Sequence, residues 1–165
     1  MRALIFISIF SISGLLLVSC QKRDYLKNGL PEYASHYYAA YLPNNNSVVT
    51  AQRSQTALLK LTVQFYSAFV PNYDAIAFYK TSTDGISNPA VLGQDYAIVD
   101  SNGNAIQPVD GKYSIVFPQA KRATDTIYVK MLNNTTPGTR RVQVQLMDNL
   151  TDTYEVDTFS TAYNR

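Results

Sequence analysis

The chain has 165 residues, and its 14 basic and 12 acidic side chains give a formal charge of +2. A near-neutral chain lacks the basic footprint of nucleic-acid-binding proteins, so we expect no nucleic-acid partner. A single cysteine excludes an internal disulfide and a cysteine-based metal site. The length is enough for one domain with a real hydrophobic core.

The first 20 residues, MRALIFISIFSISGLLLVSC, have the pattern of a secretory signal. Arg2 precedes an apolar run over residues 3–18, which is shorter than the ~20 residues that a membrane-spanning helix needs. The run ends in Leu17-Val18-Ser19-Cys20, which resembles a bacterial lipobox. The resemblance implies that residues 1–19 are removed as a lipoprotein signal peptide and that Cys20 is acylated. Several acyl chains would then anchor the protein to a membrane; an ordinary signal with an incidental cysteine is the alternative.

Residues 20–32, CQKRDYLKNGLPE, predict a flexible tether between the lipidated cysteine and a folded domain. The stretch also resembles the surface-export signal of Bacteroidetes lipoproteins, in which Gln-Lys and several acids follow the cysteine. Gln21 and Lys22 match this signal, whereas Arg23 departs from it and Asp24 supplies an acid. The resemblance implies a lipid-anchored protein of the outer membrane. The departure leaves open whether the protein faces the cell surface or the periplasm.

Residues 33–42 are the one stretch whose secondary structure stays open. Pro31 followed by Glu32 could begin a helix. Tyr37, Ala39 and Tyr41 alternate with other residues, however, and the segment is rich in aromatic side chains, which favours a strand. We therefore expect a first strand here, with a helix as the alternative.

The rest of residues 33–165 alternates apolar and polar side chains, the pattern of strands with one buried face. The pattern is clearest over residues 57–69, and it returns over 125–132 and 140–147. The side chains expected to face inward are Leu59, Leu61, Val63, Phe65, Ile127, Val129, Met131, Val142, Val144 and Leu146. Those expected to face outward include Gln64, Tyr66, Thr126 and Tyr128. Turn-forming residues separate the runs, so we predict an all-β domain: a single immunoglobulin-like antiparallel sandwich of about seven to eight strands.

From residue 76 to residue 149 the order of these patterns resembles a Calx-beta domain. The most specific part is Gly93-Gln94-Asp95-Tyr96, a turn ending in Gly-x-Asp-Tyr, and strands of the forms x-Ile-x-Phe, Ile-x-Val and Val-x-Leu follow it. The chain is similar to Bacteroidetes surface lipoproteins of unknown function that carry one immunoglobulin-like sandwich. Since such proteins often accompany glycan-uptake systems, the resemblance implies a glycan or an uptake protein of the outer membrane as partner.

Some Calx-beta domains bind calcium through clustered acids, and calcium takes about 6–8 oxygen ligands. The corresponding loop offers Asp148 and Asp152, with Asp95, Glu155 and Asp157 as further acids. So few acids predict no metal site. The simpler role for Asp95 is a turn or a backbone cap.

No motif for catalysis or cofactor binding is present in the sequence. His36 is the only histidine, too few for a histidine metal site, and we expect it to be a partly exposed strand residue. The chain has no Gly-x-Ser-x-Gly nucleophile elbow and no glycine-rich phosphate loop between a strand and a helix. We therefore expect no enzyme activity and no cofactor.

Tyrosine is the unusual residue, with 13 copies against 7 phenylalanines and no tryptophan. Tyrosine offers rigid contact area with a polar tip, which suits recognition of sugars or proteins. The alternative is that tyrosine simply favours strands. The candidate ligand-binding residues are Tyr33, Tyr37, Tyr38, Tyr41, Tyr66 and Tyr128. Thr126 is a candidate for O-glycosylation, because Asp125-Thr126-Ile127 resembles the tripeptide that Bacteroidetes modify.

The sequence thus predicts a non-catalytic outer-membrane lipoprotein that acts as a binding or accessory module, with glycan binding as the leading function. The alternative is a structural or adhesive surface protein that binds another protein. Glycan binding predicts a tyrosine patch with neighbouring Asn and Asp side chains. Adhesion predicts an unprotected edge strand or an apolar patch.

Overall fold

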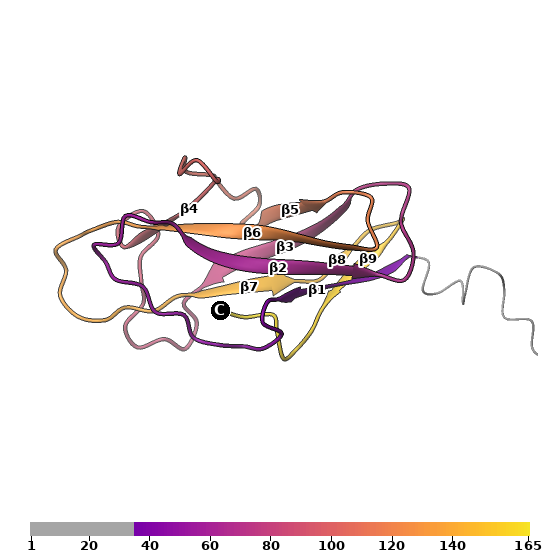
Figure 1. Cartoon of the computed structure of the whole chain (residues 1–165). Coiled ribbons are helices and arrows are strands. Elements are labelled where there is room, and N and C mark those ends of the chain that lie inside the picture. The colour runs from indigo at the N-terminus through magenta and orange to yellow at the C-terminus, as the bar shows by residue number, and fades with distance from the viewer. Residues whose placement is uncertain (1–34) are drawn as a thin grey trace, which may run out of the picture. The chain divides into compact units, whose positions relative to one another are not determined.

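The computed structural model describes residues 35–165, and this part of the chain is all β, as predicted (Figure 1). The strands are β1 (His36–Tyr41), β2 (Leu59–Ser67), β3 (Ala75–Ser82), β4 (Tyr96–Val99), β5 (Tyr113–Phe117), β6 (Arg122–Met131), β7 (Gln143–Met147), β8 (Asn149–Leu150) and β9 (Glu155–Thr158). They form a larger sheet in the order β4-β6-β2-β1-β9-β8 and a smaller sheet in the order β5-β3-β7. The signal peptide, the tether and Cys20 lie outside the described residues. In residues 35–165 no helix is long and apolar enough to cross a membrane.

The first strand is β1, which confirms the favoured interpretation of residues 33–42. Tyr37, Ala39 and Tyr41 share its buried face, because successive side chains of a strand point to opposite sides. β1 pairs antiparallel with β2 on one side and parallel with β9 on the other. The parallel pair departs from the antiparallel pattern that all other pairs of these strands follow. It sets the first described strand beside the last.

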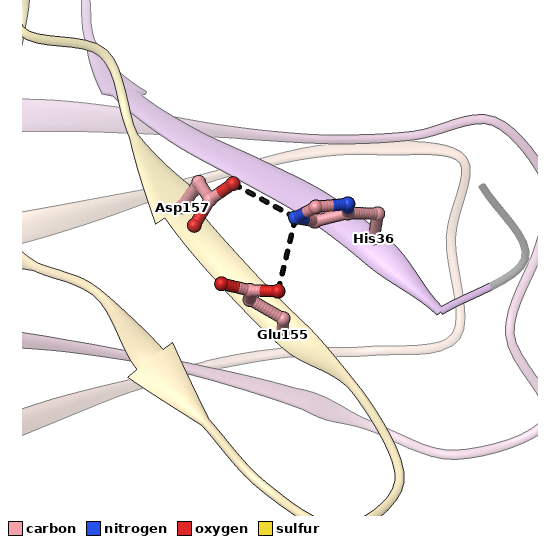
Figure 2. Close-up of side chains that lie close together, drawn as sticks. All are labelled: His36, Glu155 and Asp157. Atoms are coloured by element: carbon pink, nitrogen blue, oxygen red, sulfur yellow. Dashed lines mark ion pairs between the residues drawn. The ribbon is translucent and has the colours of Figure 1, made fainter. Parts of the chain in front are cut away.

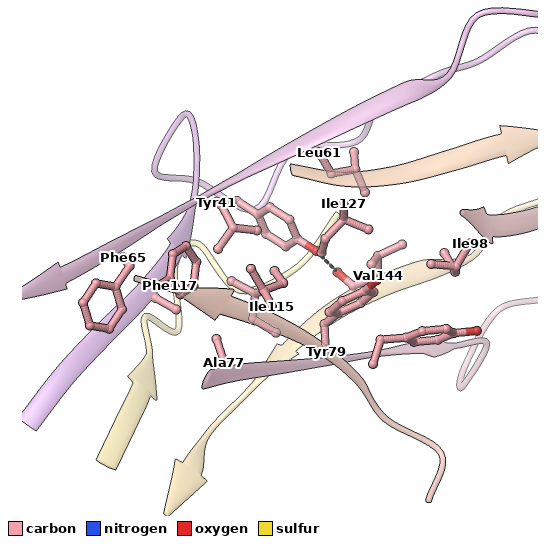
Figure 3. Close-up of a cluster of buried hydrophobic side chains, with 14 of the residues drawn as sticks. Tyr41, Leu61, Phe65, Ala77, Tyr79, Ile98, Ile115, Phe117, Ile127 and Val144 are labelled. Atoms are coloured by element: carbon pink, nitrogen blue, oxygen red, sulfur yellow. Dashed lines mark hydrogen bonds between the residues drawn. The ribbon is translucent and has the colours of Figure 1, made fainter. Parts of the chain in front are cut away.

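The core lies between the two sheets, and the residues predicted to face inward form one part of it (Figure 3). Leu61, Val63, Phe65, Ile127, Val129, Val144 and Leu146 are buried, while Leu59, Met131 and Val142 are partly exposed and pack against the cluster. Phe65 of the larger sheet stacks on Phe117 of the smaller one, with ring centroids 5.1 Å apart. Burying each such side chain stabilises the fold by roughly 1.5–3 kcal/mol.

Gln64 was expected to face outward, and it does lie on the outer side of β2, yet it is buried. Tyr66 and Arg122 account for this, since both donate hydrogen bonds to the Gln64 side-chain oxygen and cover it. Alternation predicts the direction of a side chain, whereas its burial also depends on how large its neighbours are.

The C-terminal residues protect one edge of the smaller sheet. Backbone hydrogen bonds join Val144 to Arg165 in both directions, and the Leu146 amide donates to the Tyr163 carbonyl. β7 is therefore covered on the side away from β3. β5 ends the same sheet on its other side, and none of the described strands pairs with its second edge.

Candidate functional site

Two of the candidate tyrosines lie in the core, which corrects their prediction as ligand-binding residues. Tyr37 is 1% exposed and Tyr41 is fully buried. The Tyr37 hydroxyl is 2.6 Å from the Tyr73 hydroxyl, and the Tyr41 hydroxyl donates to the Val144 carbonyl at 3.0 Å. Burial raises the pKa of both phenols well above the ordinary value. Both are structural residues, and Tyr33 lies outside the described residues.

Tyr38 and Tyr66 lie on the outer face of the larger sheet, at the centre of a row that crosses four strands. Tyr38 of β1 pairs with Tyr66 of β2 on one side and with Asp157 of β9 on the other. Tyr66 pairs in turn with Arg122 of β6. We call this surface, with the exposed Phe159 beside it, the tyrosine face; its residues are Tyr38, Tyr66, Arg122, Asp157 and Phe159.

The aromatic rings of the tyrosine face stack on one another. Tyr38 and Phe159 are parallel to within 3°, with ring centroids 5.2 Å apart, and the His36 ring stacks on Tyr38 at 5.8 Å. Tyr66 meets Phe159 edge to face at 6.4 Å. Stacked rings offer solvent their edges and polar tips more than their faces. The tyrosine face is therefore suited to polar ligands with small apolar patches.

Tyr66 and Arg122 are held in place by shared contacts. Both donate hydrogen bonds to the Gln64 side-chain oxygen, the Arg122 bond being 3.0 Å long. The Arg122 guanidinium lies over the Tyr66 ring, 5.6 Å from its centroid. Asn44 donates to the Tyr66 hydroxyl at 3.4 Å. These bonds hold the Tyr66 and Arg122 side chains in one orientation, which lowers the entropy cost of binding a ligand.

Tyr128 and Thr126 face outward on β6, as predicted, but they lie away from the tyrosine face. Tyr128 pairs with Lys60, whereas Arg122 pairs with Tyr66. At ~3.3 Å per residue the distance between Tyr128 and Arg122 along β6 is about 20 Å. Thr126 is partly exposed and lines a shallow hollow of about 340 Å³. Its glycosylation stays a prediction.

His36 contacts two acids of the neighbouring strand (Figure 2). Its Nε2 atom is 3.1 Å from Glu155 Oε2 and 2.9 Å from Asp157 Oδ2. His36 is a partly exposed strand residue, as expected, since a third of its side chain is accessible. Both of its ion-pair partners are carboxylates, and neither is the serine that a nucleophilic triad would also need.

Among residues 35–165, His36, Glu155 and Asp157 form the single group of three metal-ligating side chains within reach of one ion. This group was not predicted, because one histidine is too few for a histidine site and the acids were considered only as calcium ligands. Asp148, from the loop at residues 147–152 that was considered for calcium, accepts hydrogen bonds from the amide and hydroxyl of Thr158 at 2.8 Å. The group forms only through the parallel pairing of β1 with β9, which no local sequence pattern predicts.

Asp95 caps a turn, as predicted. Its carboxylate accepts a hydrogen bond from the Val91 amide at 2.7 Å, and it contacts Asn134 and Arg140. The Val91 bond, and after it the Asn134 bond and the Arg140 charge, lower the pKa of Asp95. Gly93 has a φ of +79°, a backbone conformation that favours glycine. The Gly-x-Asp-Tyr motif is thus a structural turn.

Comparison with known proteins adds one finding to this geometry. No protein-family model matches the chain, and no curated protein or solved structure matches it.

Proposed function

We propose that the chain is a non-catalytic, lipid-anchored protein of the outer membrane that binds a glycan beside a polysaccharide-uptake system. The lipobox-like end of the signal, Leu17-Val18-Ser19-Cys20, supports the anchor. The Calx-beta-like order of patterns from residue 76 to residue 149 supports a role beside a polysaccharide-uptake system. The tyrosine face supports a glycan as the ligand.

The row Arg122, Tyr66, Tyr38 and Asp157 carries the proposal. A sugar presents hydroxyl groups that both donate and accept hydrogen bonds, together with small C–H patches. The row offers a guanidinium donor, a carboxylate acceptor and two phenols that can do either, all beside aromatic rings. Asn44 and Asp157 are the amide and acid neighbours that a sugar site was expected to have.

Affinity electrophoresis of the full chain in detergent, against a broad panel of polysaccharides, tests this proposal. We expect at least one polysaccharide to retard the protein, and Tyr66→Ala to abolish the retardation. Tyr128→Ala is the matched control, because it removes a tyrosine from the same outer face about 20 Å away. Retardation that survives Tyr66→Ala, or none across the panel, would contradict glycan binding at this face.

A second candidate function, adhesion to another protein, is favoured by β5. This strand reads YSIVF, carries no charge and has no described strand on its second edge. Val116, the fourth of its five residues, is half exposed. An open, uncharged edge of this kind can accept a strand from a partner.

Pull-down from solubilised outer membranes separates this function from glycan binding. Adhesion through β5 predicts a captured protein that is lost with Val116→Lys, since a charge on an edge strand blocks pairing. Capture that is unchanged by Val116→Lys and lost with Tyr66→Ala would instead assign the partner to the tyrosine face.

A further inference from the structure

Three side chains from two strands converge on one point at the end of the tyrosine face. His36 belongs to β1, and Glu155 and Asp157 belong to β9, where they share a face because they are two residues apart. The parallel register sets Glu155 opposite His36 and Asp157 opposite Tyr38. One ligand atom from each side chain lies within 4.8 Å of the other two. Figure 2 shows the imidazole directed between the two carboxylates.

A bound cation would stabilise the two neighbouring carboxylates of this cluster. Two carboxylates this close repel each other unless a positive charge lies between them. Across residues 35–165, His36 is the one ion-pair partner of either acid. The Nε2 atom of His36 is shielded from solvent, and neither oxygen lies in good hydrogen-bond geometry to it. A shared ion would satisfy both the nitrogen and the two acids.

Two of the three distances between ligand atoms are close to those around a small transition-metal ion. With zinc–ligand bonds of about 2.0–2.2 Å in a tetrahedron, neighbouring ligand atoms are about 3.3 Å apart. The Nε2–oxygen distances of 2.9 and 3.1 Å need to open by only a few tenths of an ångström. A nitrogen with two carboxylates suits zinc and its neighbours, whereas calcium needs more oxygen ligands.

We propose that His36, Glu155 and Asp157 bind a divalent transition-metal ion of the zinc class. Three protein ligands leave a fourth tetrahedral position for water or a ligand atom. The side chains are 33%, 39% and 30% exposed, so solvent reaches the rim of the cluster although the Nε2 atom itself is covered. The ion also ties β1 to β9 and holds the His36 ring against Tyr38. The proposal goes beyond glycan binding and does not rest on it.

Calorimetric titration of the metal-free full chain with ZnCl2 tests the site, in detergent and with a purification tag that contains no histidine. Thermal unfolding with and without Zn²⁺ gives a second readout, since an ion that binds the folded state raises the Tm. Visible absorption of the Co²⁺ form reports a tetrahedral site directly. CaCl2 and MgCl2 serve as control ions.

The variants are His36→Ala, Asp157→Asn and Glu155→Gln, the last two being nearly the same size as the native residues. Cys20→Ser removes the single thiol of the chain, and Asp148→Asn changes an acid that bonds Thr158 instead of His36. We expect one Zn²⁺ per chain in the wild type and in both controls, and at least tenfold weaker binding in the three cluster variants. Circular dichroism verifies that each variant is folded.

The proposal is overturned if the wild type binds no Zn²⁺. It is also overturned if binding persists in His36→Ala and in a folded Asp157→Asn or Glu155→Gln protein, or if Cys20→Ser removes it. Each of these readouts is independent of any sugar, so failure here leaves the glycan proposal to its own test.

Discussion

The hydroxyl of Tyr41 donates a 3.0 Å hydrogen bond to the carbonyl oxygen of Val144, and it thereby ties β1 of the larger sheet to β7 of the smaller one (Figure 3). The ring is fully buried, and the Arg165 guanidinium lies 4.7 Å from its centroid. Tyr41 therefore joins the two sheets and the C-terminal residue at one point in the core.

Removing this hydroxyl should destabilise the fold without disturbing its packing. Tyr41→Phe keeps the ring and loses one buried hydrogen bond, which is worth about 1 kcal/mol. The loss is limited because the Val144 carbonyl also accepts from the Arg165 amide. Urea denaturation measures the change in the free energy of unfolding. Tyr38→Phe is the control, since Tyr38 is partly exposed on the outer side of β1. An equal effect of the two changes would refute the structural role of the Tyr41 bond.

Arg165 should stabilise the same corner of the fold. Its guanidinium donates to the carbonyls of Pro43 and Asn45 and covers the Tyr41 ring. We expect Arg165→Ala to lower the free energy of unfolding by about 1–2 kcal/mol, from lost hydrogen bonds and a lost cation–π contact. Thermal unfolding gives the measurement, with the exposed Lys121→Ala as the reference. A Tm equal to that of the reference variant would show that these contacts contribute nothing.

Asp95→Ala should reduce stability in a manner that depends on pH. The pKa of Asp95 is lowered in the fold, so the folded state favours the charged carboxylate. Its stabilisation is present above the unfolded pKa of about 3.9 and is lost as the pH falls through the lower folded value. We expect a loss of about 1–2 kcal/mol at pH 7 from the missing hydrogen bonds. The difference from the wild type should shrink below about pH 4.

Denaturation curves from pH 2 to pH 8 measure this profile. Asp95→Asn is the matched control, because its side-chain oxygen can still accept from the Val91 amide but carries no charge. A difference between Asp95→Ala and the wild type that stays constant across this range would mean that the charge plays no part.

The direction of side chains could be predicted from the sequence, because a strand has a fixed period of two. The predictions of the inward residues of β2 and of a strand at His36–Tyr41 were therefore correct. The same period separates Tyr37 and Tyr41 from Tyr38, yet the prediction placed all three among the ligand-binding residues. Their density in the sequence suggested one patch, whereas the fold divides them between the core and the tyrosine face.

The acid cluster around His36 could not be predicted in this way. Its geometry requires that β1 and β9 be neighbours and that their pairing be parallel. Neither the choice of partner nor the direction is encoded in a local pattern, since pairing is set by packing of the whole sandwich. The row from Arg122 to Asp157 depends on the same long-range registers.

Tyr66 and Arg122 should be energetically coupled across the β2–β6 pair. The guanidinium lies over the ring, and both side chains share the Gln64 oxygen. A cation–π contact at a partly exposed site contributes about 0.5–1 kcal/mol. We expect a double-mutant cycle of Tyr66→Leu and Arg122→Ala, followed by urea denaturation, to give a coupling energy of this size. Tyr128→Leu with Arg122→Ala is the control cycle and should give about zero, since these residues are about 20 Å apart. Equal coupling in both cycles would mean that the Tyr66–Arg122 contact has no specific energy.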